Sequence, residues 1–304
     1  PDQGRHGHGD PRAVGGAAAG VVAVSAPAIP TDRRLLPANG RVAATWLDGH
    51  VTSDRFVEGT PACVALPVLD LCAAPEGARA RQMLRGEAVT VYETREGWCF
   101  VQRACDGYVG YVPQDALSTG EPPTHRVATP ATHLYPAPDM KRRELAWLSF
   151  GSQLRVVSAS GDFYELDDGS FVPRPHLRPI NRPFRDPVTV AQLHFGVPYL
   201  WGGNSTAGID CSGLVQAALL AAGLDCPGDS DQQAATLGAL LAEDAPLRRG
   251  DLLFWKGHVA MAVDGEILIH ANAHHMGVAY EPVAEAVERI AAAGDGPVTA
   301  RRRL

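Results

Sequence analysis

Hydrophobic and polar residues alternate in different ways along this chain. Between Pro61 and Ile180 the apolar residues form short runs rich in Val, Tyr and Leu, which Gly, Pro and Asp interrupt. This pattern predicts short β-strands. The stretch from Leu214 to Leu224 is instead one apolar run without Pro, and it predicts a buried helix. Strands are predicted again for three later runs, Leu252 to Trp255, His258 to Val263 and Ile267 to His270.

The first strand-rich region contains an internal repeat. Leu71 begins LCAAPEGARARQMLRGEAVTVYETREGWCFV, followed by GYVGYVPQDAL, and Leu134 begins LYPAPDMKRRELAWLSFGSQLRVVSASGDFYEL, followed by GSFVPRPHL. Each copy has a Pro-marked loop, a glycine turn (Gly86, Gly151) and a last strand that closes on V-P-x-x-x-L. Units of roughly sixty residues bury little surface alone, so we expect two small barrels that pack on their neighbours.

These patterns divide the chain into an N-terminal part, two small β domains and a larger C-terminal domain. In the arm that precedes the barrels we find one helical candidate, Arg41 to Leu47, and no residues that indicate chemistry. The C-terminal domain should open with a short helix over Val188 to Phe195. The expected segments are a disordered leader at 1–30, the arm at 31–60, barrels at 61–120 and 124–180, a Pro-rich linker at 181–187 and the last domain at 188–304.

Composition and charge exclude several classes of function. The chain has 304 residues, of which 45% are hydrophobic and 20% charged, so it is globular. Its net charge of −7 and its short basic runs, Lys141 to Arg143 and Arg301 to Arg303, argue against nucleic-acid binding. None of the six cysteines forms a CxxC pair, and no stretch is apolar enough to span a bilayer. We therefore expect free thiols and no stable membrane insertion.

Cys211 stands where a glycine-punctuated loop meets the apolar run. Asp210 occupies the expected N-cap position, which places Cys211 in the first turn of the helix. Exposed backbone N–H groups and the helix dipole favour a thiolate there, and such surroundings can lower a cysteine pKa to roughly 3.5–7.5. The position suits a nucleophile.

Two histidines flank a predicted hairpin turn at Asp264-Gly265. A plain two-residue loop would put His258 and His270 on opposite faces of the hairpin, whereas a three-residue loop or a bulge brings them onto one face. If the histidines act together, the turn should therefore be irregular. In the order Cys, His, His the chain can supply a nucleophile, its base and a residue that orients the base.

The motifs YLWGG, GIDCSGLVQ, CPGDSDQQ, GDLLFWKGHVAM and LIHANA resemble the NlpC-type papain-like cysteine peptidases, bacterial enzymes that cut peptidoglycan stem peptides. The match covers nearly all of Asp186 to Ile290. The preceding region, including GYVGYVP, resembles tandem bacterial SH3-like domains. The resemblance implies an α+β chain of two SH3-like β-barrels followed by a papain-like (NlpC-type) α+β catalytic domain. As a whole the chain resembles γ-D-glutamyl-L-diamino acid endopeptidases of cell-wall recycling.

The resemblance also implies roles for individual residues. Cys211 matches the nucleophile, His258 the general base and His270 the residue that orients it. Tyr199 matches a tyrosine whose hydroxyl stabilises the oxyanion together with the Cys211 backbone N–H. Neither a metal nor a cofactor is required. A zinc site built from His258, His270, His274 and His275 is the alternative, but these residues lack a carboxylate or thiolate partner at a familiar spacing.

A substrate pocket follows from the same resemblance. Asp229 and Ser230 match the pair that grips the free α-amine of the substrate's first L-alanine. Tyr108 of the first barrel matches a tyrosine that closes this pocket, with Tyr111 as its nearby competitor. Gly228 stands where many relatives carry Arg, which leaves the support of the pocket open. Further predicted substrate contacts are Asp210, Ser212 and Trp201, of which Asp210 is also a candidate helix cap.

The expected substrates are murein-derived peptides such as L-Ala-γ-D-Glu-diamino acid. Two alternatives are a non-catalytic cell-wall-binding or scaffold protein, and an amidase or acyltransferase on the same scaffold. The scaffold alternative predicts loss of one of Cys211, His258 and His270, and all three are present. We expect a monomer in the cytoplasm, with a periplasmic or cell-wall location as the alternative.

Overall fold

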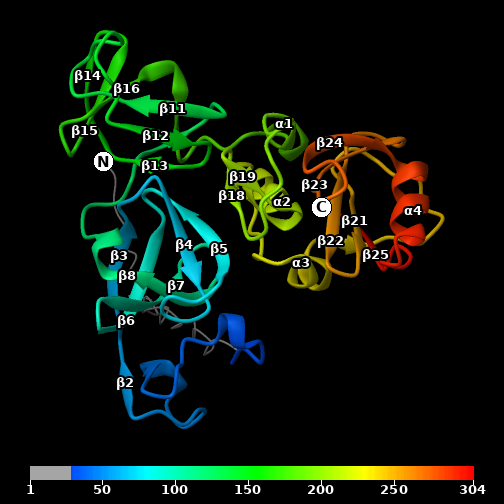
Figure 1. Cartoon of the computed structure of the whole chain (residues 1–304), viewed down its shortest axis with the longest axis horizontal. Helices are drawn as coiled ribbons and strands as arrows, with labels where there is room; N and C mark the ends of the chain where they lie inside the picture. Colours follow the sequence, from blue (N-terminus) through cyan, green and yellow to red (C-terminus); the bar gives the residue numbers. More distant parts are fainter. Residues whose placement is uncertain (1–28) are drawn as a thin grey trace, which may run out of the picture.

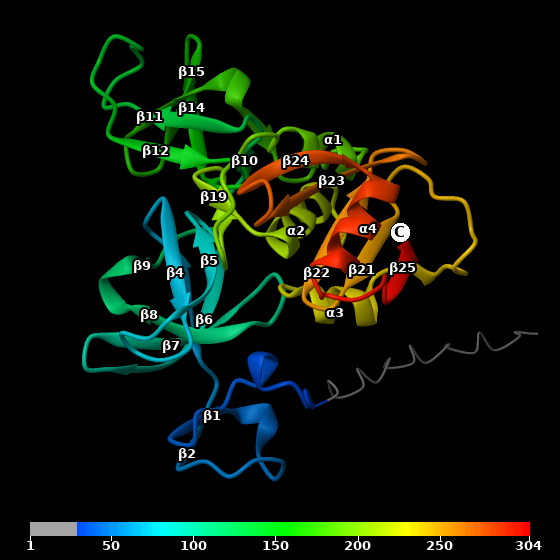
Figure 2. The ribbon, with the colours of Figure 1, turned by 45° about the vertical axis from the view of Figure 1, so that its right-hand side comes forward.

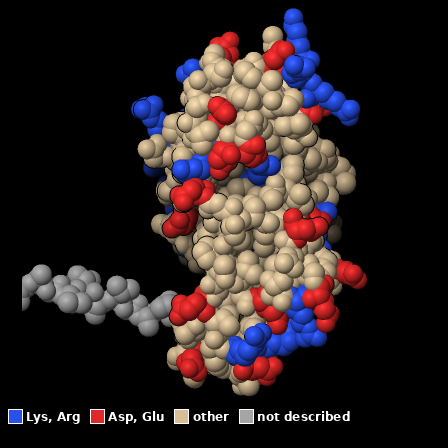
Figure 3. Space-filling view, turned by 90° about the vertical axis from the view of Figure 1, so that its left-hand side faces the viewer, with Lys and Arg blue, Asp and Glu red and all other residues tan. Residues whose placement is uncertain are grey.

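The computed structural model describes residues 29–304, so nearly all of the leader expected at 1–30 lies outside the described residues. Two β domains stand beside a larger α+β domain, which confirms the expected fold class (Figure 1). Acidic and basic side chains are interspersed on the face that the two β domains present in Figure 3. Among the described residues, no helix has the length and apolar character needed to cross a membrane.

The arm forms a small unit of its own, and its expected helix was wrong. Arg41 to Leu47 contains a strand, β1 (Val42–Ala44), which pairs in parallel with β2 (Arg55–Val57), and only a 3-10 turn, η2 (Thr45–Leu47). Buried apolar residues of the arm pack against Tyr92 of the first barrel, and this packing overrides helix propensity. A second 3-10 turn, η1 (Arg33–Leu35), precedes them.

The first barrel is a curled seven-stranded sheet with the strand order β5-β4-β8-β7-β6-β3-β9. Its inward side chains form a separate core that includes Leu71, Met83 and Val101. The elements are β3 (Thr60–Val64), β4 (Val68–Cys72), β5 (Arg79–Leu84), β6 (Ala88–Arg95), β7 (Trp98–Arg103), β8 (Val109–Pro113), η3 (Gln114–Ala116) and β9 (Leu117–Ser118).

The second β domain repeats the first in a smaller form. Both copies end in a strand, one 3-10 turn and another strand, as the repeat predicts, but the strands of the second copy form three separate small sheets rather than one. Its elements are β10 (His125–Val127), β11 (Ala131–Leu134), β12 (Ala146–Ser149), β13 (Gln153–Leu154), β14 (Val156–Ser160), β15 (Phe163–Leu166), β16 (Phe171–Pro173), η4 (Arg174–His176) and β17 (Leu177–Pro179).

The C-terminal domain is a six-stranded sheet with helices on both faces. Alternate residues of its central strands pack against α1 and α2 on one face and against α4 on the other. Its helices are α1 (Pro187–Gln192), α2 (Cys211–Ala221), α3 (Ser230–Thr236) and α4 (Val283–Ala292). Its strands are β18 (Asn204–Ser205), β19 (Gly208–Ile209), β20 (Ala239–Leu240), β21 (Leu252–Trp255), β22 (His258–Ala262), β23 (Ile267–Asn272), β24 (Gly277–Pro282) and β25 (Ala300–Arg303).

Both β domains pack on the C-terminal domain (Figure 2): Arg81 of the first donates to Asn204 of β18, and Arg126 of the second donates to the Leu220 carbonyl near the end of α2. The second β domain inserts Phe150, which is 2% exposed, into the core around α1 and α2. Its ring lies 5.9 Å from that of Phe184 and 5.2 Å from that of His194. The β18–β19 hairpin lies between the two β domains, since Asn204 accepts from Arg81 of the first and the Thr206 N–H donates to Ser149 Oγ of the second at 2.9 Å.

The two barrels meet at a glycine turn. Gly86 has a φ of 80°, and a Cβ atom added there would lie 2.1 Å from the backbone oxygen of Gln153. The Gln153 N–H donates to the Arg85 carbonyl across the same contact, at 2.8 Å. Only glycine permits this close approach.

We expect Gly86→Ala to lower the free energy of unfolding by about 1 kcal/mol more than Gly97→Ala does, because overpacking a close contact costs about 1–3 kcal/mol. Gly97 has the same φ of 80° and nothing within 4 Å of an added Cβ, so it controls for backbone strain alone. Urea-induced unfolding followed by circular dichroism measures both losses. Equal losses would show that the close contact with Gln153 adds no cost beyond the backbone strain that both variants share.

Candidate active site

Asp210 caps α2 and ties it to the preceding loop. Its Oδ1 accepts hydrogen bonds from the Gly213 N–H at 2.6 Å and the Ser212 hydroxyl at 3.0 Å, and its Oδ2 accepts from the Gly202 N–H at 3.0 Å. The predicted N-cap is confirmed. Asp210 and Ser212 were predicted as substrate contacts, but both are buried and their side chains are committed to the cap.

Cys211 lies in the first turn of α2 as predicted, but the predicted low pKa was wrong. Burial raises the pKa of the thiol to about 12, and the nearby Asp210 carboxylate raises it further. The backbone N–H groups of Val259, Ser212 and Cys211 act in the opposite direction without overcoming these effects. The sequence indicated that Cys211 begins a helix, but it did not indicate that the residue is buried. Cys211 is only 7% exposed, and burial disfavours the charged thiolate. At neutral pH the thiol is therefore protonated.

The hairpin that carries the two histidines has the irregular turn that their cooperation requires. Met261 pairs with Ile269 and Ala262 with Leu268, and the Val263 N–H donates to the Ile267 carbonyl. Three residues, 264–266, are left to form the loop. His258 and His270 consequently share one face, and the prediction is confirmed.

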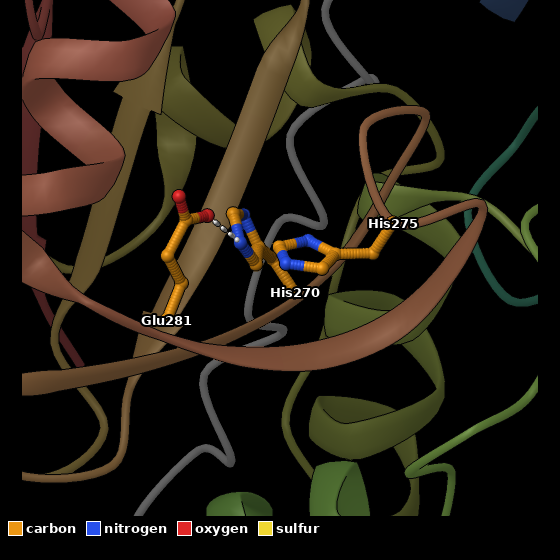
Figure 4. Close-up of side chains that lie close together, drawn as sticks. All are labelled: His270, His275 and Glu281. Atoms are coloured by element: carbon orange, nitrogen blue, oxygen red, sulfur yellow. Dashed lines mark hydrogen bonds and ion pairs between the residues drawn. The ribbon is translucent and has the colours of Figure 1, made fainter.

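A line of hydrogen bonds runs from His258 to α4. His258 Nε2 lies 2.9 Å from His270 Nδ1, and His270 Nε2 lies 2.9 Å from Glu281 Oε2. Arg289 then donates to both oxygens of Glu281, at 2.7 and 2.8 Å. Figure 4 shows the Glu281 carboxylate facing the His270 ring.

This order of partners fixes the position of each proton. The Glu281 carboxylate can only accept, so His270 Nε2 carries a proton and the Nδ1 of a neutral His270 accepts. His258 must therefore donate from Nε2, which leaves the lone pair of its Nδ1 free. That nitrogen is the one able to take a proton from a thiol.

Both rings are neutral at physiological pH. Burial lowers the pKa of His258 to about 3, and His270 and Arg289 lower it further. Burial also lowers the pKa of His270 to about 4, against the opposing effect of Glu281. Burial alone would raise the pKa of Glu281, but Arg289 and His270 lower it to about 2. The carboxylate charge is thus retained while the rings stay uncharged.

Tyr199 lies close to the thiol. Burial raises the pKa of its hydroxyl to about 12, with further contributions from Cys211 and Asp210. Trp201 is 72% exposed on the loop before α2, and its carbonyl accepts from Arg79 of the first barrel. Within residues 29–304, no hydrogen bond joins Cys211 to His258; such catalytic contacts often tighten only when substrate binds.

Asp229 is held by three side chains from other parts of the molecule. Its Oδ1 accepts from Arg81 at 2.9 Å, and its Oδ2 accepts from Arg34 at 2.8 Å and from the Tyr108 hydroxyl at 3.2 Å. Tyr111 instead accepts from Asn39 of the arm. The structure thus brings Tyr108, and not its competitor, to Asp229. Ser230 begins α3 and is half-buried.

Arg81 occupies the space that a side chain at position 228 would need. A Cβ added to Gly228 would lie 3.0 Å from Arg81 Cδ and Nε and 3.2 Å from the Tyr108 ring. The Arg81 guanidinium is fully buried and also donates to Asn204 at 2.9 Å. Arg81 of the first barrel therefore lies against Gly228, directly beside the Asp229-Ser230 pair.

Sequence reasoning missed four residues of this site. Glu281 and Arg289 lie in the sequence after the last of the motifs quoted above. The alternation of β24 and their eight-residue spacing across the start of α4 could have indicated that the two side chains meet. Nothing local marks Arg81 or Arg34, which act 148 and 195 residues away along the chain. Arg34 belongs to the arm, in which the sequence indicated no chemistry, and it bonds to Asp229.

The structure also bears on the alternative metal site. His270, His275 and Glu281 offer ligand atoms within 4.8 Å of one another, and Figure 4 shows the two rings close together. However, Glu281 already binds Arg289 through both oxygens, and His270 bonds to Glu281 and His258. An ion could bind there only by breaking these contacts. His274 does not belong to this group.

Two family models match the chain. Residues 196–290 match the NlpC/P60 family, and residues 71–117 match the bacterial dipeptidyl-peptidase SH3 domain. The first match contains Cys211, His258, His270 and Glu281, and the second contains Arg81 and Tyr108. Asp229, Arg81 and Tyr108 thus all come from the two matched regions, whereas Arg34 of the arm lies outside both.

The chain is similar to curated proteins named gamma-D-glutamyl-L-lysine dipeptidyl-peptidase. It is 27% identical to the Bacillus cereus protein over 230 residues, 62% of this chain and 66% of that protein. It is 28% identical to the Bacillus subtilis protein over 215 residues, 62% of this chain and 71% of that protein. A solved NlpC/P60 family structure from Bacillus cereus shares the fold, with a TM-score of 0.67, 22% identity, and coverage of 80% of this chain and 99% of that one.

We expect Glu281→Gln to lower kcat by about a hundredfold or more, because a base held in the wrong tautomer costs activity on this scale. Both oxygens of Glu281 accept from Arg289, so an amide must turn its NH₂ group toward a donor in either orientation. With NH₂ at the Oε1 position it faces Arg289 Nε, and with NH₂ at the Oε2 position it donates to His270 Nε2 and reverses the proton order of both rings. Glu285→Gln, on the exposed side of α4, is the matched control. Steady-state peptidase kinetics measure the effect, and a loss below about threefold would contradict the proton order.

Acidification should destabilise the folded protein between pH 6.5 and about 4. The folded-state pKa values of His258 and His270 lie below their ordinary value of 6.5, so in this interval the unfolded chain binds more protons. Stability is then full above pH 6.5 and falls by up to about 1.4 kcal/mol per pH unit for each histidine. Urea unfolding at several pH values tests this, with His270→Asn expected to flatten the slope. A flat profile in the parent protein would contradict neutral rings.

Proposed function

We propose that this chain, which joins an NlpC/P60 domain to a bacterial SH3 domain, is a cysteine peptidase that cleaves the γ-D-glutamyl bond of short peptidoglycan peptides with a free N-terminal L-alanine. The observation that carries the proposal is the meeting of Asp229, Arg81 and Tyr108 beside a helix that begins with a cysteine. The names of the two Bacillus relatives support the same bond type, with L-lysine as the diamino acid.

The first half of the reaction forms a thioester. His258 Nδ1 takes the proton of the Cys211 thiol, and the sulfur attacks the γ-carbonyl carbon of D-glutamate. Negative charge develops on the carbonyl oxygen, where the Tyr199 hydroxyl and the Cys211 N–H would donate. When the C–N bond breaks, His258 gives its proton to the leaving amine. Because the resting thiol is protonated, the proton transfer belongs to the reaction itself rather than to a preformed ion pair.

The second half releases the dipeptide. Water attacks the thioester carbon and gives a proton to His258, and the departing Cys211 sulfur recovers that proton. His270 and Glu281 stabilise the transient imidazolium in both halves, since Glu281 keeps its charge beside His270. His258 thus accepts a proton and gives it up again in each half of the reaction.

The pocket around Asp229 explains the proposed choice of substrate. A half-buried carboxylate favours an ammonium group and disfavours a blocked N-terminus, whose polar groups would not be matched. Tyr108, which is 6% exposed, and Arg81 bring the first barrel against this carboxylate. Long glycan-linked chains would meet the barrel at this point, whereas a free-ended peptide ends there.

Cleavage of a defined peptide pair tests the proposal. L-Ala-γ-D-Glu-L-Lys should yield L-Ala-D-Glu, detected by mass spectrometry, and its N-acetylated form should react about thirtyfold more slowly, which corresponds to about 2 kcal/mol for an unmatched pocket charge. Cys211→Ala should abolish cleavage, while Cys105→Ala, at an exposed thiol, should leave it intact.

Three outcomes would contradict the proposal. Absence of cleavage by the parent protein would favour a scaffold, and unchanged cleavage by Cys211→Ala would exclude the thioester route. Equal rates for free and acetylated peptides would remove Asp229 from substrate selection. Transfer of the acyl group to an added amine in preference to water would favour the acyltransferase alternative.

A further inference from the structure

Arg34 of the N-terminal arm occupies the carboxylate that the proposed function assigns to the substrate's amine. Its Nη1 donates to Asp229 Oδ2 at 2.8 Å, on the same oxygen that accepts from Tyr108. Arg34 lies in η1, outside both regions that match known families. The amine pocket therefore already contains a cation when no substrate is bound.

The remaining donors of Arg34 are also occupied. Nε donates to both oxygens of Asp32 at 3.0 Å, and Nη2 donates to Asp32 at 2.7 Å and to Asp231 at 2.6 Å. Nη1 has a second acceptor in Asp231, at 3.0 Å. All five N–H groups of the guanidinium thus have acceptors, and only one of these bonds goes to Asp229.

The arm that carries Arg34 is attached independently of Asp229. Asp32 accepts from Gln232 of α3 at 2.9 Å, and Arg41 donates to Glu93 of the first barrel at 2.7 Å. Arg34 can consequently give up its bond to Asp229 while the arm, Asp32 and Asp231 stay in place. The exchange requires a side-chain movement and no opening of the domains.

We propose that Arg34 is a resident competitor of the substrate ammonium group, so that substrate binding and product release are exchanges of one cation for another at Asp229. This inference rests on the proposed function. The product L-Ala-D-Glu keeps the same free α-amine as the substrate, and Asp229, paired only with Arg81 and Tyr108, would retain it. Return of Arg34 to Asp229 weakens that retention, because Arg34 takes the place of the departing ammonium group at Oδ2.

Removal of the competitor should tighten the binding of every ligand with a free amine. For Arg34→Gln we expect KM for L-Ala-γ-D-Glu-L-Lys and the inhibition constant of L-Ala-D-Glu to fall together by about two- to fivefold, the scale of one partly exposed ion pair. The value of kcat should not rise. A purely structural arginine would give the opposite sign, since loss of an anchor loosens the pocket and raises both constants.

Arg33→Gln is the matched control. Arg33 is the neighbouring residue of η1, it is exposed, and its side chain makes no hydrogen bond or ion pair among the described residues. Both variants remove one positive charge from the same turn, and Arg33→Gln should leave both constants unchanged. Arg34→Met, which keeps an unbranched apolar stem and removes every hydrogen-bond donor of the side chain, should reproduce Arg34→Gln, and thermal melting of each variant establishes that it is folded.

The outcomes separate this inference from the proposed function. Cleavage by the parent protein with unchanged or raised constants in Arg34→Gln and Arg34→Met overturns the competitor role alone. Equal changes in Arg33→Gln overturn it too, because the effect would then be one of overall charge. Absence of cleavage by the parent protein overturns the proposed function and this inference with it. Lower constants in the Arg34 variants alone support the exchange.

Discussion

A fully buried arginine joins the two halves of this molecule. Arg81 leaves the first barrel and enters the C-terminal domain, where Asp229 and Asn204 accept from its guanidinium. A charge removed from water must be paired, and its loss of pairing costs several kcal/mol. If the barrel moved away from α3, Arg81 would lose its partner Asp229. The position of Tyr108 on the pocket, and the need for glycine at 228, both follow from it.

The same constraint extends into a polar network below the pocket. Gln216 of α2 accepts from Asn204 at 3.0 Å and donates to Asp106 of the first barrel at 2.9 Å, and Arg103 donates to Asp106 at 2.8 Å. Networks of this kind are costly if any member lacks a partner, so they fix one relative arrangement of two domains. The helix that begins with Cys211 thereby takes part in holding the first barrel against the C-terminal domain.

Features that lie within one or two secondary-structure elements could be predicted from the sequence, whereas contacts between distant elements could not. The cap at Asp210, the repeat and the odd loop between the histidines follow from spacing, because each depends on residues within one or two elements. The pKa of Cys211 was predicted in the wrong direction, since burial is set by the α2 core and not by the helix start. Arg34, Arg81 and Glu281 reach the site through tertiary packing, which periodicity does not encode. The motifs therefore indicated the candidate catalytic residues, while the contacts around Asp229 became visible only in the folded structure.

The three-residue loop at 264–266 has a consequence for how this chain can change. It is exposed, so substitutions of Gly265 and Glu266 should be nearly neutral, whereas Asp264 holds the turn by accepting from the Glu266 and Ile267 N–H groups at 2.8 and 2.9 Å. The length of the loop is constrained more strongly, because deletion of a single residue would shift one strand by one position and turn one histidine to the other side of the sheet. Among homologous chains, we expect positions 265 and 266 to vary freely, and insertions and deletions in this loop to come in pairs. We therefore expect selection to act more on the length of this loop than on its composition.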